Sequence, residues 1–107
     1  MSKDQRRTKF YFTEYVNHAI RFYLSTPERV PVEGKSSASL QNWMAAQSVI
    51  YRLPEKDQEV IRAVFAKQRA VPESVDTYCQ ETGADKAEVW NLVVRTVYRV
   101  ARVRGLV

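Results

Sequence analysis

The chain has 107 residues, of which 45% are hydrophobic and 27% charged, a composition typical of one soluble globular domain. No apolar run approaches the ~18 residues that a membrane-spanning helix needs, and no secretory signal follows the basic N-terminus. Cys79 is the only cysteine, which excludes an intramolecular disulfide and a cysteine-based zinc site. We therefore expect a cytoplasmic protein that does not associate with membranes.

The net charge of +5 is unevenly distributed along the chain. No acidic residue follows Glu88, whereas four arginines do: Arg95, Arg99, Arg102 and Arg104. A second basic cluster lies near the N-terminus and contains Lys3, Arg6, Arg7 and Lys9. Such cationic ends suit a polyphosphate surface, where cation contacts supply most of the non-specific affinity. The alternative is that they are solvated faces of basic helices.

Apolar residues at helical spacing predict a first helix from about Phe12 to Leu24, with a buried side formed by Phe12, Tyr15, Val16, Ala19, Ile20 and Tyr23. Prolines, serines and a glycine then predict a mobile linker over 26–39. We expect Ser39 to cap a second helix over 40–52. Its predicted buried side contains Leu40, Trp43, Met44, Gln47, Ile50 and Tyr51, with Trp43 and Met44 in the core.

Three further helices are predicted in the C-terminal half. Pro54 suits the first position of the third helix, whose predicted buried side is Val60, Ile61, Val64 and Phe65. A short fourth helix begins at Pro72 and ends at Gly83, with Val75, Tyr78 and Cys79 facing inward. Asp85 is predicted to cap a fifth helix that reaches about Val103 and buries Val89, Leu92, Val93, Thr96, Val97 and Val100.

The sequence thus predicts an all-α fold of five helices, because no segment alternates with the period of a strand. We divide it into an N-terminal helix and linker over 1–39 and a helical domain over 40–107, packed as one compact unit. Within the second part, residues 72–104 form a short helix, a glycine turn and a long basic helix. This order is typical of a helix-turn-helix, in which the second helix enters the major groove of DNA.

Two segments carry a resemblance to a known family. The segment LPEKDQEVI (53–61) resembles the opening helix of region 4 of bacterial sigma factors, and GADKAEVWNL (83–92) resembles the turn and recognition helix of that region. The resemblance covers about residues 53–104, so it implies that the last three helices form a sigma-region-4-like helix-turn-helix. The residues before Leu53 do not resemble the domain with which sigma factors bind the −10 element. The chain therefore resembles phage and mobile-element regulators more than a complete sigma factor.

The resemblance also implies which residues meet DNA. Lys86 matches a family residue that contacts the promoter −35 element. Ala87, Trp90 and Asn91 stand where the family commonly has an acidic residue, a basic residue and a glutamine, which points away from a standard −35 sequence. Asn91 can still pair with adenine, and Ala87 can touch a thymine methyl group. The predicted DNA-binding set is completed by arginines that would contact phosphates, namely Arg95, Arg99 and Arg102.

The function predicted from these residues is that of a sequence-specific DNA-binding transcriptional regulator, with double-stranded DNA and RNA polymerase as partners. The alternative is a helical protein–protein interaction module, such as an accessory subunit of RNA polymerase or of another regulator. The aromatic first helix suggests a homodimer face. We expect no enzyme activity, cofactor or metal, because the single histidine, His18, has no second ligand or nucleophile at useful spacing.

Overall fold

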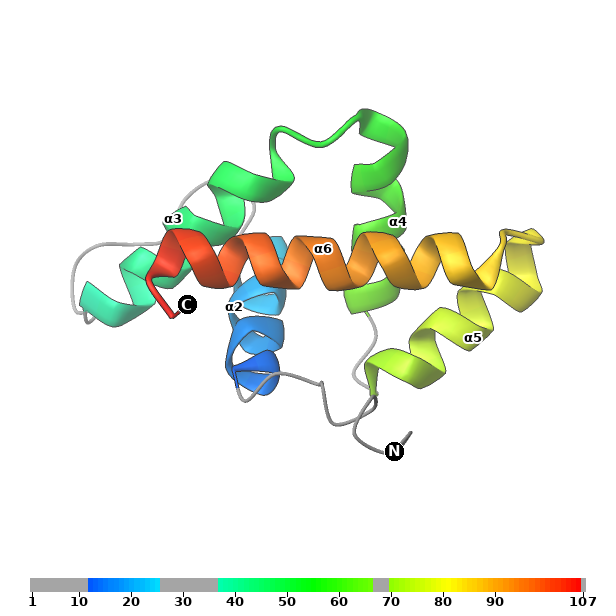
Figure 1. The fold of residues 1–107 in the computed structure, drawn as a ribbon, viewed down its shortest axis with the longest axis horizontal. Helices are drawn as coiled ribbons and strands as arrows, with labels where there is room; N and C mark the ends of the chain where they lie inside the picture. Colours follow the sequence, from blue (N-terminus) through cyan, green and yellow to red (C-terminus); the bar gives the residue numbers. More distant parts are fainter. Residues whose placement is uncertain (1–11, 26–36, 67–69, 107) are drawn as a thin grey trace.

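A computed structural model describes residues 12–25, 37–66 and 70–106 of the chain, and these residues form helices with no strand (Figure 1). Within these residues, the predicted all-α class and the predicted five helices are confirmed. The helices are α2 (Thr13–Ser25), α3 (Ser37–Ile50), α4 (Glu55–Ala66), α5 (Val71–Thr82) and α6 (Lys86–Arg104). The basic cluster near the N-terminus and the part of the predicted linker over 26–36 lie outside the described residues.

Helix α2 lies in the middle of the fold, where it packs against α3, α4 and α6. Its buried residues include Val16, Ala19 and Ile20, as predicted, and Phe12, just before its start, is also buried as predicted. The helix ends at Ser25, just before the Thr26-Pro27 step. Tyr15 was predicted on the buried side but is 42% exposed. Of the aromatic residues that suggested a homodimer face, Phe12 is buried and both Phe22 and Tyr23 are half-buried, whereas Phe10 and Tyr11 lie outside the described residues.

Helix α3 differs from its prediction in two ways. It begins at Ser37, so Ser39 is a helical residue and not the cap, and the predicted linker does not extend over 37–39. Trp43 is buried as predicted, but Met44 is 53% exposed and Tyr51 73% exposed. Ile50 is buried as predicted, and the side that faces α2 and α6 also buries Ala45, Ala46 and Val49. Burial of the small residues Ala45 and Ala46 in place of the larger Met44 and Tyr51 could not be predicted from side-chain size alone.

Helix α4 begins at Glu55, one residue later than predicted, and the carbonyl oxygen of Pro54 accepts the first helical hydrogen bond from the backbone N–H of Gln58. The side-chain Nε2 of Gln58 also donates to the carbonyl oxygen of Leu53 at 2.9 Å, which closes the turn between α3 and α4. Ile61, Val64 and Phe65 are buried as predicted, whereas Val60 is half-buried. In α5, Val75 is buried and both Tyr78 and Cys79 are half-buried against the core.

Two local signals set the boundary between α5 and α6. Gly83 ends α5 in the left-handed conformation with φ of 79°, as predicted for a glycine at this position. Asp85 caps α6, and its carboxylate accepts a hydrogen bond from the backbone N–H of Glu88 at 3.0 Å. Helix α6 then continues to Arg104 and buries every residue of its predicted apolar stripe.

The far end of α6 is fastened to the rest of the fold by a polar cluster. The Arg104 Nε donates to Asn42 Oδ1 at 2.6 Å, and the hydroxyl of Tyr15 donates to the same oxygen at 3.2 Å. This contact explains why Tyr15 stays near the surface, since its hydroxyl needs a polar partner. It also gives Arg104 a structural role that joins α6 to α3.

Candidate nucleic-acid interface

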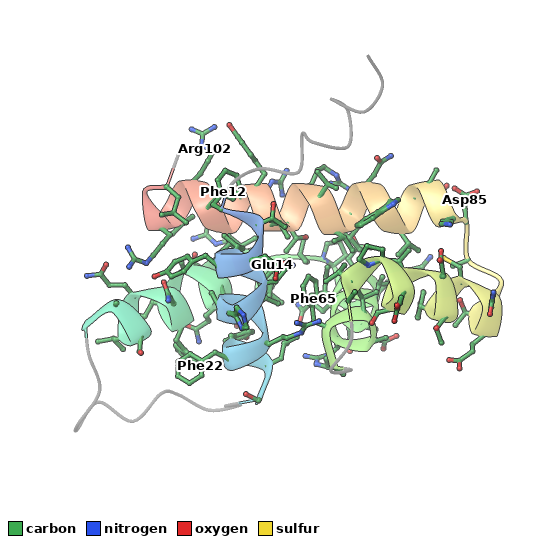
Figure 2. The ribbon with its side chains drawn as sticks, turned by 90° about the horizontal axis from the view of Figure 1, so that it is seen from below. Phe12, Glu14, Phe22, Phe65, Asp85 and Arg102 are labelled. Atoms are coloured by element: carbon green, nitrogen blue, oxygen red, sulfur yellow. The ribbon has the colours of Figure 1, made fainter. Side chains whose placement is uncertain are left out.

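Helix α6 lies along one side of the molecule. Figure 1 shows it crossing the other helices, and in Figure 2, seen from below, the four other helices lie on one side of it. The side of α6 that faces these helices is fully apolar apart from Thr96, and consists of Val89, Leu92, Val93, Thr96, Val97, Val100 and Ala101. Residues on the opposite side are exposed from Ala87 to Arg102.

The exposed side of α6 is divided into two parallel rows. We call the first the neutral row, because its members carry no charge: Ala87, Asn91, Val94 and Tyr98. We call the second the charged row, and it contains Glu88, Arg95, Arg99 and Arg102. Within each row the residues are three, four or seven positions apart, the spacing that places side chains above one another on a helix. All eight residues are exposed, and Arg102 points away from the other helices in Figure 2.

The two rows contain most of the residues predicted to contact DNA. Ala87 and Asn91 lie in the neutral row, and Arg95, Arg99 and Arg102 lie in the charged row. The structure thus brings five of the predicted residues together on one exposed surface. Lys86 and Trp90 lie elsewhere on the helix, on the side of the neutral row that is remote from the arginines.

Lys86 is directed toward α5. Its Nζ lies 2.6 Å from a carboxylate oxygen of Asp76, and both side chains are exposed, at 60% and 50%. The hydrogen bond and the charge of Asp76 raise the pKa of Lys86 above its usual value of 10.5. In this arrangement Lys86 joins α5 to the first turn of α6 and does not share a face with Asn91.

Trp90 is half-buried and packs against the hydrophobic core. A tryptophan at this position stabilises the start of α6 on the rest of the fold, since large aromatic rings rarely remain fully exposed. The indole ring of Trp90 therefore contributes to packing of the core, and the exposed side of α6 is formed by other residues, including those of the neutral row.

Three residues of the two rows were not predicted as part of the site, namely Glu88, Val94 and Tyr98, and neither was Asp76 of α5. Val94 is 48% exposed, and Tyr98 is 37% exposed with its ring centroid 6.5 Å from that of Phe12. Their positions, seven and eleven residues after Ala87, would have placed both in the neutral row. No comparable signal existed for Asp76, because its contact with Lys86 depends on the angle at which α5 and α6 meet.

Charge changes along α6. The start of α6 is acidic overall, because Asp85 and Glu88 together with Asp76 of α5 outnumber the single cation Lys86, whereas the charged residues of its later turns are all arginines. An anionic partner is therefore attracted to the later turns and repelled near the first. The electrostatic attraction of this surface depends on the arginines of the charged row.

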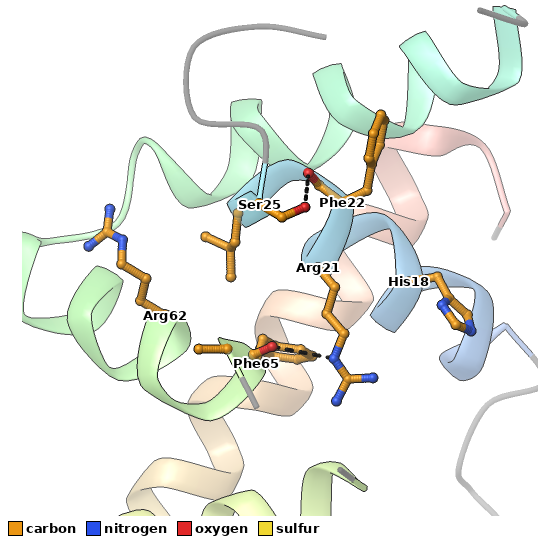
Figure 3. Close-up of a pocket in the computed structure, with 8 residues that line it drawn as sticks. His18, Arg21, Phe22, Ser25, Arg62 and Phe65 are labelled. Carbon is orange, nitrogen blue, oxygen red and sulfur yellow. Dashed lines mark hydrogen bonds between the residues drawn. The ribbon is translucent and has the colours of Figure 1, made fainter. Parts of the chain in front are cut away.

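A cavity of about 450 Å³ lies between α2 and α4 (Figure 3). Its lining residues do not form a binding surface comparable to the two rows of α6. Arg21, on its wall, donates from Nε to the carbonyl oxygen of Phe65 at 3.3 Å and lies over the Phe65 ring, so it caps the end of α4. His18 and Arg62 lie at opposite ends of the view in Figure 3 and point apart. Among the described residues, no cluster of three or more histidine, cysteine or acidic side chains is placed to hold a metal ion.

Comparison of the chain with protein-family models, curated proteins and solved structures finds no match. In the described part of the chain, no helix has the length and apolar character needed to cross a membrane. We therefore infer the function from the residues of α6 and their surroundings.

Proposed function

We propose that the protein is a sequence-specific DNA-binding transcriptional regulator in which α5 and α6 form a helix-turn-helix. Helix α6 is the recognition helix, and its exposed side enters the major groove. The resemblance of residues 53–104 to sigma factor region 4 supports this assignment, and so does the three-residue connection Gly83–Asp85 between the two helices. RNA polymerase is a further partner under this proposal.

The observation that carries the proposal is the pair of exposed rows on α6. A helix of 19 residues is about 28 Å long, and the major groove, about 12 Å wide, admits one helix. The neutral row begins with small and polar side chains that fit against base edges. The charged row places three arginines along one side of the same helix, at the spacing needed to follow phosphates.

The acidic residues of the first turn constrain how the helix docks. Phosphates repel Asp85 and Glu88, so the first turn must face base edges inside the groove and not the backbone. The later turns then leave the bases and pass the phosphates, where Arg99 and Arg102 meet the backbone. This orientation matches the general one for a helix-turn-helix, whose N-terminal side chains contact bases.

The proposal is tested by the binding of the full chain to a labelled random-sequence duplex, measured by fluorescence anisotropy at several salt concentrations. We expect binding at low salt that weakens linearly on a plot of log K against log salt. Heparin, a polyanion without grooves, serves as a competitor that separates docking in a groove from general attraction to negative charge. A chain that binds no duplex at low salt is not a DNA-binding protein.

One observation favours a second candidate, the helical protein–protein interaction module. Helix α3 contains no charged residue, yet Met44 on its outward side and Tyr51 just after its end are more than half exposed. An uncharged, partly apolar surface of this kind suits a protein partner such as RNA polymerase or another regulator. Under this alternative, Met44→Glu abolishes partner binding while variants of the charged row leave it unchanged.

A further inference from the structure

The two rows on α6 differ in a way that bears on which DNA sequence the helix selects, an inference that rests on the proposed function. The neutral row presents Ala87, Asn91 and Val94 over its first three turns, and Val94 is 48% exposed although it is fully apolar. Its exposed methyl groups lie beside Asn91 in the same row, where both side chains can contact one partner.

The start of α6 is fixed, so the direction of these three side chains is also fixed. The Asp85 carboxylate accepts from the backbone N–H of Glu88 at 3.0 Å, and Val89 and Leu92 are buried in the core. These contacts prevent the helix from rotating about its axis. Ala87, Asn91 and Val94 therefore point outward together.

The charged side chains at the start of α6 lie to either side of this row. Lys86 is held toward α5 by Asp76, with 2.6 Å between Nζ and the carboxylate. Glu88 lies in the charged row, on the other side. The centre of the exposed surface over the first three turns is thus uncharged.

Each base pair selects for a different side-chain chemistry in the major groove. Guanine is recognised by arginine or lysine and cytosine by a carboxylate, whereas adenine pairs with asparagine or glutamine and the thymine methyl group contacts apolar side chains. The neutral row contains the residues that suit adenine and thymine and none that suits guanine or cytosine.

We propose that the neutral row of α6 selects A·T base pairs, with Asn91 bound to adenine and Ala87 and Val94 in contact with thymine methyl groups. The arginines of the charged row then lie along the phosphates of one strand and add affinity without sequence preference. The selection of base pairs and the electrostatic attraction to phosphates therefore come from two different sides of one helix.

The test begins with selection of bound sites from random duplex DNA by the full chain. We expect adjacent A·T pairs at the centre of the selected site. On that site, Asn91→Ala should lower the affinity by about fivefold to 150-fold while leaving the affinity for random duplex nearly unchanged. Selection of a G·C centre with clear salt-dependent binding would overturn this inference and leave DNA binding intact. Absence of binding to any duplex would overturn the proposed function itself.

Altered bases identify the atoms involved. Replacing the central adenine with 7-deazaadenine removes the N7 acceptor, which should weaken binding by the natural chain and have no further effect on Asn91→Ala. Replacing the central thymines with uracil removes their methyl groups and should weaken binding by about fourfold per methyl group in contact. This decrease should be smaller for Val94→Ala. Equal decreases for the natural chain and both variants would contradict the assigned contacts.

Two variants of the charged row serve as matched controls. Arg99→Ala should weaken binding to A·T and G·C sites alike, and Glu88→Ala should strengthen both alike, because each changes only the interaction with phosphates. The preference for A·T pairs should survive in both variants. If Glu88→Ala abolished the preference, sequence selection would come from the carboxylate and the assignment to the neutral row would be wrong.

Discussion

At the scale of single residues, the ion pair between Lys86 and Asp76 decides what the first turn of α6 can do. The resemblance to sigma factors implies that Lys86 contacts DNA, whereas in the structure its ammonium group lies 2.6 Å from Asp76. Asp76 is ten positions earlier on another helix, and its approach depends on the angle at the Gly83 turn. Sequence periodicity contains no information on that angle, so this contact could not be predicted.

Replacing Asp76 with asparagine should release Lys86 and remove a negative charge near the DNA. We expect Asp76→Asn to bind every duplex more tightly, and its salt dependence to become steeper by about one unit if Lys86 then reaches a phosphate. The pKa of Lys86 should fall toward its usual value, because the variant lacks the carboxylate whose hydrogen bond and charge raise it. Anisotropy and NMR titration measure the two effects. Weaker binding by Asp76→Asn would show that the ion pair is needed to position α6.

The ion pair also gives a direction for the dependence on pH. Since its pKa is raised in the folded state, Lys86 contributes stability that is present below pH 10.5 and is lost as the pH rises through the folded-state value. Asp76→Asn should remove this alkaline decrease in stability. Both groups are exposed, so the effect on the stability of the whole chain is small.

At the scale of helices, the residues at which α5 ends and α6 begins could be predicted from the sequence, whereas the packing of α3 against its neighbours could not. Gly83 and Asp85 act on their nearest neighbours, so the end of α5 and the start of α6 follow from the sequence. The buried stripe of α6 was also predictable, because one side of that helix is almost purely apolar. Helix α3 has apolar residues on most sides, so the sequence did not show which side packs against α2 and α6, and the structure buries Ala45 and Ala46 there.

The charged row of α6 gives a prediction at this scale. Arg99→Ala or Arg102→Ala should weaken binding to all duplexes and lower the salt slope by about one unit for each phosphate that the helix no longer touches. Arg62→Ala is the matched control, because Arg62 is an exposed arginine of α4 beside the cavity and away from α6. Arg62→Ala should leave the salt slope of DNA binding unchanged. An equal decrease for Arg62→Ala would mean that net charge, and not the position of the arginines, governs binding.

At the scale of the whole molecule, the described helices share one hydrophobic core. Ile20 of α2 belongs to the same buried cluster as Phe65 of α4 and Val100 of α6. The packing of α2 in the middle of the fold means that removal of its side chains would expose the buried sides of three other helices. We therefore expect the helices to unfold together.

The two tryptophans test this cooperativity. Trp43 lies beside Tyr23 of α2, with ring centroids 5.4 Å apart, and Trp90 lies at the start of α6. In Trp43→Phe and in Trp90→Phe, the fluorescence of the remaining tryptophan should change at the same denaturant concentration as the far-UV circular dichroism of that variant. Separate midpoints would show that the N-terminal and C-terminal parts are independent units.

Docking of α6 on DNA through its exposed side is tested most directly by NMR. Backbone amide shifts of the full chain are recorded with and without a selected duplex. We predict that the largest changes fall on the neutral and charged rows, from Ala87 to Arg102, while Gln41 and Met44 on the outward side of α3 remain unchanged. Changes confined to α3, with none on α6, would contradict docking through α6 and favour the protein–protein interaction module.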